Sequence, residues 1–144
     1  MTSAKIRQQI RYYTNLLEET REDRRTIEQN LSAVRTLAEN RRKMYDQMND
    51  DLAIRRNKLN GSSIDINRVR IMKNLSQGLE GLLSQGNIHL TRLAEQKYQI
   101  ARAESDLEDR ARACSIKERN YVNTIADLRR QLSTAEAEEA IQNA

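Results

Sequence analysis

The stretch NKLNGSSIDINR, residues 57–68, interrupts a chain that otherwise favours continuous helix. Asn60 and Gly61 tolerate a positive φ and are typical of the end of a helix. Ser62 or Ser63 then supplies an N-cap for a following helix. These four residues therefore predict a tight turn. Because a helix end and a helix start this close together favour antiparallel neighbours, the two flanking helices are expected to pair as a hairpin.

The composition of the chain is typical of long helices. Among the 144 residues there is no Pro, Phe or Trp, aromatic residues make up 3%, and charged residues make up 32%. A compact domain of this size would normally bury several large aromatic rings. The composition therefore predicts one elongated, all-α domain.

A seven-residue apolar repeat runs along both sides of the turn. In the first arm, one register of residues spaced seven apart begins at Ile6, and a companion register begins at Ile10. The alternating three- and four-residue steps persist over about eight heptads, which favours a left-handed coiled coil. The second arm carries two registers of the same kind. The residues expected in the core of this seam are Ile10, Leu17, Ile27, Leu31, Val34, Leu52, Leu59, Leu93, Ile100, Leu107, Tyr121, Ile125 and Leu128.

Together these patterns predict an antiparallel two-helix coiled-coil hairpin. Helix one is expected over about residues 4–59, the turn over about 60–63 and helix two over about 64–137, with a flexible acidic tail after it. With this turn, residue n should face roughly residue 123 minus n, and roughly twenty residues of the second arm should overhang. The glycine-containing stretch at 84–89 either breaks the second helix or only weakens it, and both alternatives remain open.

A second set of residues falls beside the seam, where it would form either a partner-facing stripe or extra core width. Amphipathic tyrosine rings suit an interface, and glycines would let a partner helix approach closely. The candidate residues are Tyr12, Leu16, Leu37, Met44, Ile54, Gly78, Gly81 and Tyr98.

The sequence lacks the motifs of common catalytic and ligand-binding sites. There is one histidine, His89, one cysteine, Cys114, no metal-ligand spacing and no glycine-rich phosphate loop. Acidic residues lie beside nearly every arginine doublet, which favours a solvated, ion-paired surface over a nucleic-acid interface. We therefore expect no enzyme activity, no metal or cofactor and no nucleic-acid binding.

Location and assembly are predicted only in outline. No apolar run approaches the roughly 18–20 residues needed to cross a bilayer, and no apolar signal segment follows the N-terminus. A cytoplasmic protein is expected, with export by a leaderless route as an alternative. The partner of the seam-flanking residues is expected to be another helical protein, and a self-associating structural coiled coil is the alternative.

The plan of a long helix, a glycine turn and a second long helix resembles the small helical-hairpin proteins of type VII secretion. LNGSS at 59–63 stands at the place of the WxG turn, with Leu59 in place of Trp, and the helix INRVRIMKNLSQGLEGLL follows at 66–83. In particular, the chain looks like the larger WxG-type relatives, the non-toxin partners that bind the helical N-terminal domain of LXG toxins. The chain is also similar to flagellar-type (FliJ-like) export stalk proteins, coiled-coil hairpins that insert into an ATPase ring. Both resemblances imply a non-catalytic secretion component that binds a helical protein.

Overall fold

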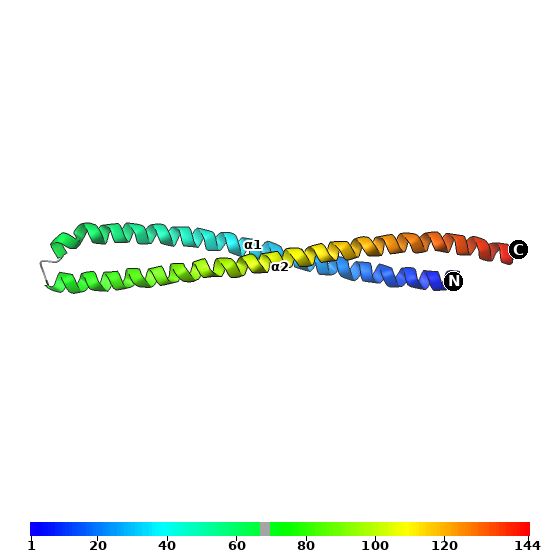
Figure 1. The fold of residues 1–144 in the computed structure, drawn as a ribbon, viewed down its shortest axis with the longest axis horizontal. Helices are drawn as coiled ribbons and strands as arrows, with labels where there is room; N and C mark the ends of the chain where they lie inside the picture. The colour runs from blue at the N-terminus through cyan, green and yellow to red at the C-terminus, as the bar shows by residue number, and fades with distance from the viewer. Residues whose placement is uncertain (67–69) are drawn as a thin grey trace. The chain divides into compact units, whose positions relative to one another are not determined.

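The computed structural model consists of two helices, α1 over Ser3–Ile66 and α2 over Arg70–Gln142 (Figure 1). It describes the whole backbone except residues 67–69, and the side chains except those of residues 59–73 and 76. The described residues form no strand. The two helices pack together as an all-α helical hairpin, which confirms the fold class predicted from the heptads.

Local sequence explains why each helix persists for so many residues. The Thr2 hydroxyl accepts a hydrogen bond from the Lys5 N–H at 3.4 Å and caps the start of α1. Ion pairs one turn apart, such as Arg24–Glu28 in α1 and Asp106–Arg110 in α2, each add a few tenths of a kcal/mol. Since such local terms are small, most of the stability must come from the packing of one helix on the other.

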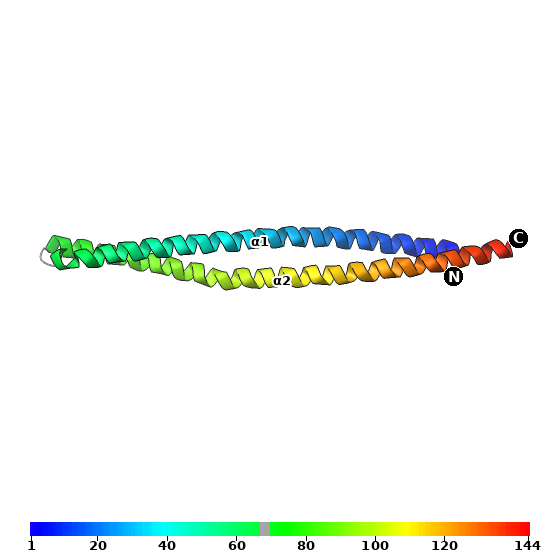
Figure 2. The ribbon, with the colours of Figure 1, turned by 90° about the horizontal axis from the view of Figure 1, so that it is seen from above.

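The first of two compact units joins Met1–Ser32 to Ser105–Ala144, and we call it the terminal unit. Its helices run antiparallel in both views (Figure 2). Ile6, Leu128 and Ala135 form a buried cluster, with Ile6 only 2% exposed. Ile10 and Tyr13 pack against this cluster from α1, and so does Leu132 from α2. The terminal unit therefore closes on a buried apolar cluster near the ends of the chain.

The second unit, Ala33–Glu104, is called the turn-proximal unit. Most of its seam residues are only half-buried, and Leu90 is its one fully buried hydrophobic residue with a described side chain. Leu52 packs directly on Gly86, because a Cβ added at that glycine would lie 2.7 Å from Leu52 Cδ2. The close packing of Leu52 on α2 therefore requires that residue 86 has no side chain.

The seam residues named from the sequence occupy the faces between the helices. Leu17, Leu31, Ile125 and Leu128 are buried. The structure does not describe the side chain of Leu59. The half-buried members are Ile10, Ile27, Val34, Leu52, Leu93, Ile100, Leu107 and Tyr121.

The predicted position of the turn is wrong. Asn60, Gly61, Ser62 and Ser63 lie inside α1, which continues to Ile66. Neither Gly nor Asn forbids a helix, and Gly costs only about 1 kcal/mol relative to Ala. The heptad also continues, since Ile66 follows Leu59 by seven residues in the companion register. The connection between the helices therefore falls at residues 67–69, outside the described residues.

The predicted register and the predicted tail are wrong for the same reason. Arg24 pairs with Glu118, about nineteen residues beyond the position near 99 that the earlier turn implies. The last turns of α2 are helical and pack against the start of α1, so the predicted overhang of roughly twenty residues does not occur. Glu139 accepts hydrogen bonds from the N–H and hydroxyl of Ser3 at 2.9 and 2.7 Å, and Ala135 is 9% exposed. The stretch at 84–89 is continuous helix, so the break offered as an alternative does not occur.

Candidate partner-binding face

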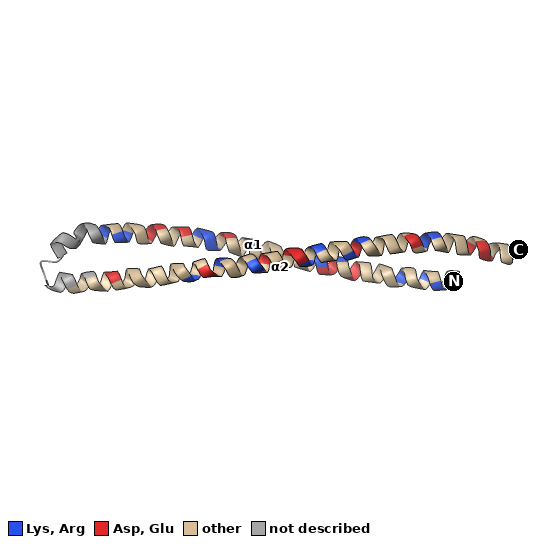
Figure 3. Cartoon of the chain, in the orientation of Figure 1, with Lys and Arg blue, Asp and Glu red and all other residues tan. Residues whose placement is uncertain are grey.

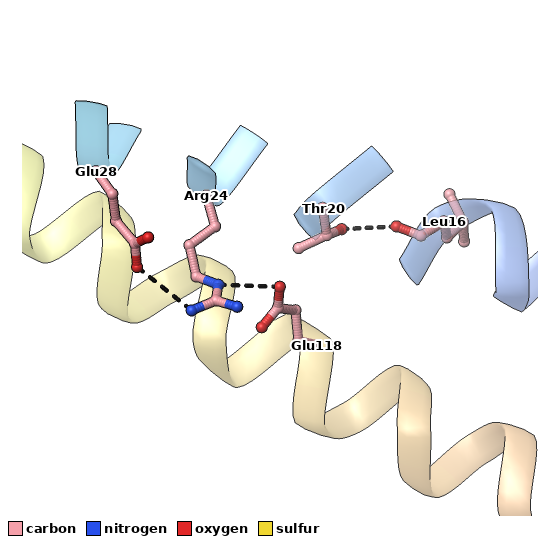
Figure 4. Close-up of polar contacts among 5 residues, drawn as sticks. All are labelled: Leu16, Thr20, Arg24, Glu28 and Glu118. Carbon is pink, nitrogen blue, oxygen red and sulfur yellow. Dashed lines mark hydrogen bonds and ion pairs between the residues drawn. The ribbon is translucent and has the colours of Figure 1, made fainter. Parts of the chain in front are cut away.

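Polar contacts hold the terminal unit in register. The Arg24 Nε donates to Glu118 across the seam at 3.0 Å, while another guanidinium nitrogen pairs with Glu28 at 3.3 Å (Figure 4). The hydrogen bond to Glu118, and then its charge, raise the pKa of Arg24 above its ordinary value. Thr20, which is 8% exposed, donates its hydroxyl to the Leu16 carbonyl and so needs no partner on α2. Both polar interruptions of this seam are therefore satisfied within the chain.

A different face of the hairpin is open in the turn-proximal unit. With the companion register as position a of the heptad and the first register as position d, Leu37 and Met44 take position g on α1, and Leu82 takes position g on α2. In an antiparallel pair the g positions of both helices flank the same side of the seam. Leu37, Met44 and Leu82 are 55%, 53% and 63% exposed. We call the exposed g side of this unit the g face.

Two grooves lie along the g face. The middle groove is lined by Leu37, Asn40, Arg41 and Met44 of α1 and by Leu93, Gln96, Gln99 and Ile100 of α2. The distal groove is lined by Met48, Asp51, Leu52 and Arg55 of α1 and by Leu82, Gln85, Gly86 and His89 of α2. Their volumes, about 460 and 330 Å³, suit inserted side chains rather than a folded domain.

Arg41 lies at the base of the middle groove. A terminal guanidinium nitrogen (Nη1) donates to the Leu93 carbonyl at 2.7 Å. The Nε of Arg41 is buried and has no hydrogen-bond partner within the described part of the chain. A cation in an apolar seam is costly unless a carboxylate pairs with it, so this position has an unmet demand for negative charge.

The residues predicted to face a partner belong to both units. Leu37, Met44 and Ile54 are exposed in the turn-proximal unit, whereas Tyr12 and Leu16 belong to the terminal unit. The Tyr12 ring stacks edge-on against Tyr13, with centroids 5.3 Å apart, and Leu16 is half-buried. The candidate face therefore divides between the two units.

The remaining members of the predicted face differ in position and surroundings. Tyr98 is 71% exposed but takes position b, on the flank of α2 away from the g face. A Cβ added at Gly78 or Gly81 would meet nothing within 4 Å, so none of the described side chains approaches either glycine closely. Gly86, a seam position that was not assigned to the predicted partner face, is the glycine that receives a packing side chain.

Sequence reasoning missed further exposed residues, Leu75, Leu79, Leu82 and Ile88 of α2. Leu79 occupies a seam position and is nevertheless 41% exposed. Residues 74–91 contain one charged side chain, Glu80, and form a mostly tan length of α2 in Figure 3. This near-absence of charge was a signal that could have located the open face.

The described residues contain no group of His, Cys, Asp and Glu side chains that could hold a metal ion. In that same part of the chain, neither helix has a segment apolar enough to span a membrane. No family model, curated protein or solved structure matches this chain. The function of the chain is therefore inferred from its geometry.

Proposed function

We propose that this chain is a non-catalytic accessory protein of a bacterial secretion system that acts in the cytoplasm by binding another helical protein. The observation that carries the proposal is the g face, where Leu37, Met44 and Leu82 are each more than half exposed. Exposed apolar residues gathered on one side of a helical protein are typical of an interaction site. By covering this face, the bound protein would itself be kept soluble or targeted.

Two kinds of partner are consistent with the resemblances. The first is the helical N-terminal domain of a secreted toxin, as for the WxG-type partners. The second is an export ATPase, as for the stalk proteins. The position of LNGSS inside α1 rather than at the turn removes one basis for the likeness to the WxG-type partners.

The test is to co-express the full chain with proteins encoded by genes adjacent to its own. A toxin partner predicts a stable complex with a large protein that has a helical N-terminus, and a stalk role predicts a complex with an ATPase. Light scattering gives the mass of any complex, and calorimetry with purified components gives its affinity. If no neighbouring product binds and the chain alone forms a stable dimer, the structural coiled-coil alternative replaces this proposal.

A further inference from the structure

The net charge of the chain is concentrated around the connection between the helices. Residues 52–91 contain six Lys or Arg and two Asp or Glu, a surplus of four. The whole chain carries the same net charge of +4, so the remaining residues balance. The described basic side chains of this segment, those of Arg55, Arg56 and Lys58, are exposed on α1, and residues 74–91 of α2 contain one charged residue, Glu80.

The two grooves repeat one arrangement along the same helix faces. Each α1 residue of the distal groove lies eleven positions after a residue of the middle groove, from Leu37 to Met48 through Met44 to Arg55. Eleven residues are close to three helical turns, so the grooves succeed each other on one side of α1, about 16 Å apart. One helix laid along the g face would reach both grooves with side chains of the same stripe.

Charge decides what kind of helix fits. The single charged side chain lining the middle groove is Arg41, and the distal groove has Arg55 and Asp51. A carboxylate entering the middle groove would meet the Arg41 guanidinium in surroundings of low polarity, where a charge pair is strong. A second copy of this chain would bring the same basic surface against itself and is disfavoured by like-charge repulsion.

We propose that the g face binds one amphipathic helix of a partner protein, with an apolar stripe flanked by Asp and Glu. The stripe fills the middle and distal grooves, and a flanking carboxylate pairs with Arg41. This inference rests on the proposed function and specifies it, since it names the surface and the chemistry of the partner segment.

The probe is a synthetic 25-residue helix of Leu, Ala and Glu, labelled with fluorescein, with leucines at i, i+4, i+7 and i+11 and glutamates on both sides of them. The matched probe has Lys at every Glu position. Fluorescence anisotropy with the full chain should show the Glu helix binding at least about tenfold more tightly than the Lys helix, because charge complementarity selects between partners. Equal affinities, or no saturable binding of the Glu helix, would overturn the proposal.

Variants then locate the site. Met44→Glu and Leu82→Glu should each weaken binding of the Glu helix about tenfold, while Tyr98→Glu, which adds the same charge on the other flank, should change it less than about twofold. Arg41→Met should reduce the preference for the Glu helix over the Lys helix. Circular dichroism checks that each variant keeps the wild-type helicity, and Met44→Gln and Leu82→Gln replace any variant that does not. If Tyr98→Glu weakened binding of the Glu helix as much as Met44→Glu and Leu82→Glu do, the g face would not be the binding site.

Two further outcomes would assign the face to another occupant. Binding of the chain to phosphatidylglycerol vesicles that Leu82→Glu abolishes would mean a lipid surface. A dimer of the chain alone that Leu82→Glu converts to a monomer would mean a second copy. Failure of the Glu helix while a folded neighbouring-gene product still binds would reject the acidic-helix inference and leave the proposed function standing.

Discussion

The terminal and turn-proximal units follow the same heptad pattern and bury it to different extents. In the terminal unit Ile6, Leu17 and Leu128 are each less than 9% exposed. Among the described side chains of the turn-proximal unit, Leu90 alone is buried to that extent. A regular heptad therefore determines which residues face the seam without determining how completely the seam closes.

The difference arises from what flanks the seam. Ion pairs cross from helix to helix in both units, Arg7–Glu136 and Arg24–Glu118 in the terminal unit and Arg35–Glu104 in the turn-proximal unit. What differs is that the g positions Leu37, Met44 and Leu82 of the turn-proximal unit are apolar and remain exposed. We infer that the terminal unit stabilises the hairpin and that the turn-proximal unit is free to bind a partner.

The largest expected effect separates the buried seam from the open face. Leu128→Ala should lower the free energy of unfolding by about 2–3 kcal/mol, because it removes a buried side chain from the terminal cluster. Leu82→Ala, at a leucine that is 63% exposed, should change it by less than about 0.5 kcal/mol. Urea unfolding followed by circular dichroism measures both. Comparable losses from the two variants would show that the g face is part of the folded core.

The glycines of α2 test the packing of the turn-proximal unit. Gly78→Ala and Gly81→Ala should each stabilise the chain by up to about 1 kcal/mol, since a Cβ meets nothing within 4 Å at either position. Gly86→Ala should give no gain or a loss of about 1 kcal/mol, because its Cβ would lie 2.7 Å from Leu52 Cδ2.

The control for this series is Leu52→Ala combined with Gly86→Ala. Leu52→Ala removes the methyl groups that obstruct a Cβ at position 86. In this background Gly86→Ala should raise the free energy of unfolding relative to Leu52→Ala alone. Equal stabilisation at all three glycines would contradict the close contact between Leu52 and Gly86.

The heptad made the fold predictable from the sequence, whereas the turn and the register were not predictable. A seven-residue repeat is spread over many residues, so one polar residue at a seam position does not obscure it. The turn depended on four residues that tolerate a turn but do not require one, and Gly61 costs too little to stop a helix. Ile66, one heptad after Leu59, was the signal that the first helix continues.

The candidate face was only partly predictable. Leu37, Met44 and Ile54 were identified by their positions beside the seam, and all three are exposed. Leu79 could not be identified as exposed, because it occupies a seam position and its burial depends on how closely the helices approach. The middle groove likewise depends on Arg41, whose contact with the Leu93 carbonyl joins residues 52 positions apart in the chain.

A smaller effect tests the register of the terminal unit. Arg24→Glu and Glu118→Arg should each lower the urea midpoint, because each variant places like charges opposite one another at a half-buried seam position. The double variant should recover part of the loss, but not all of it, since the glutamate introduced at position 24 would still face Glu28 one turn away on α1. The decrease should be smaller than that of Leu128→Ala. No recovery in the double variant would contradict the pairing of Arg24 with Glu118.

The smallest expected effect depends on pH and concerns the end of α2. Glu139 accepts hydrogen bonds from the N–H and hydroxyl of Ser3, at the N-terminus of α1, and these bonds hold the pKa of Glu139 below its ordinary value. A carboxylate with a lowered pKa stabilises the folded state above its unfolded pKa of about 4.3, and that contribution is lost as the pH falls through the lowered value.

Glu139→Gln should therefore lower the midpoint of thermal unfolding slightly at pH 7, and the difference from wild type should shrink as the pH falls below about 4.3 and through the lowered pKa of Glu139. The effect stays small because solvent screens this surface group. Glu138→Gln, at the neighbouring exposed carboxylate, is the matched control and should leave the pH dependence unchanged. A difference between wild type and Glu139→Gln that stays constant over this pH range would mean that Glu139 contributes by packing rather than by charge. The terminal unit would then remain closed at its end without help from the ionised carboxylate.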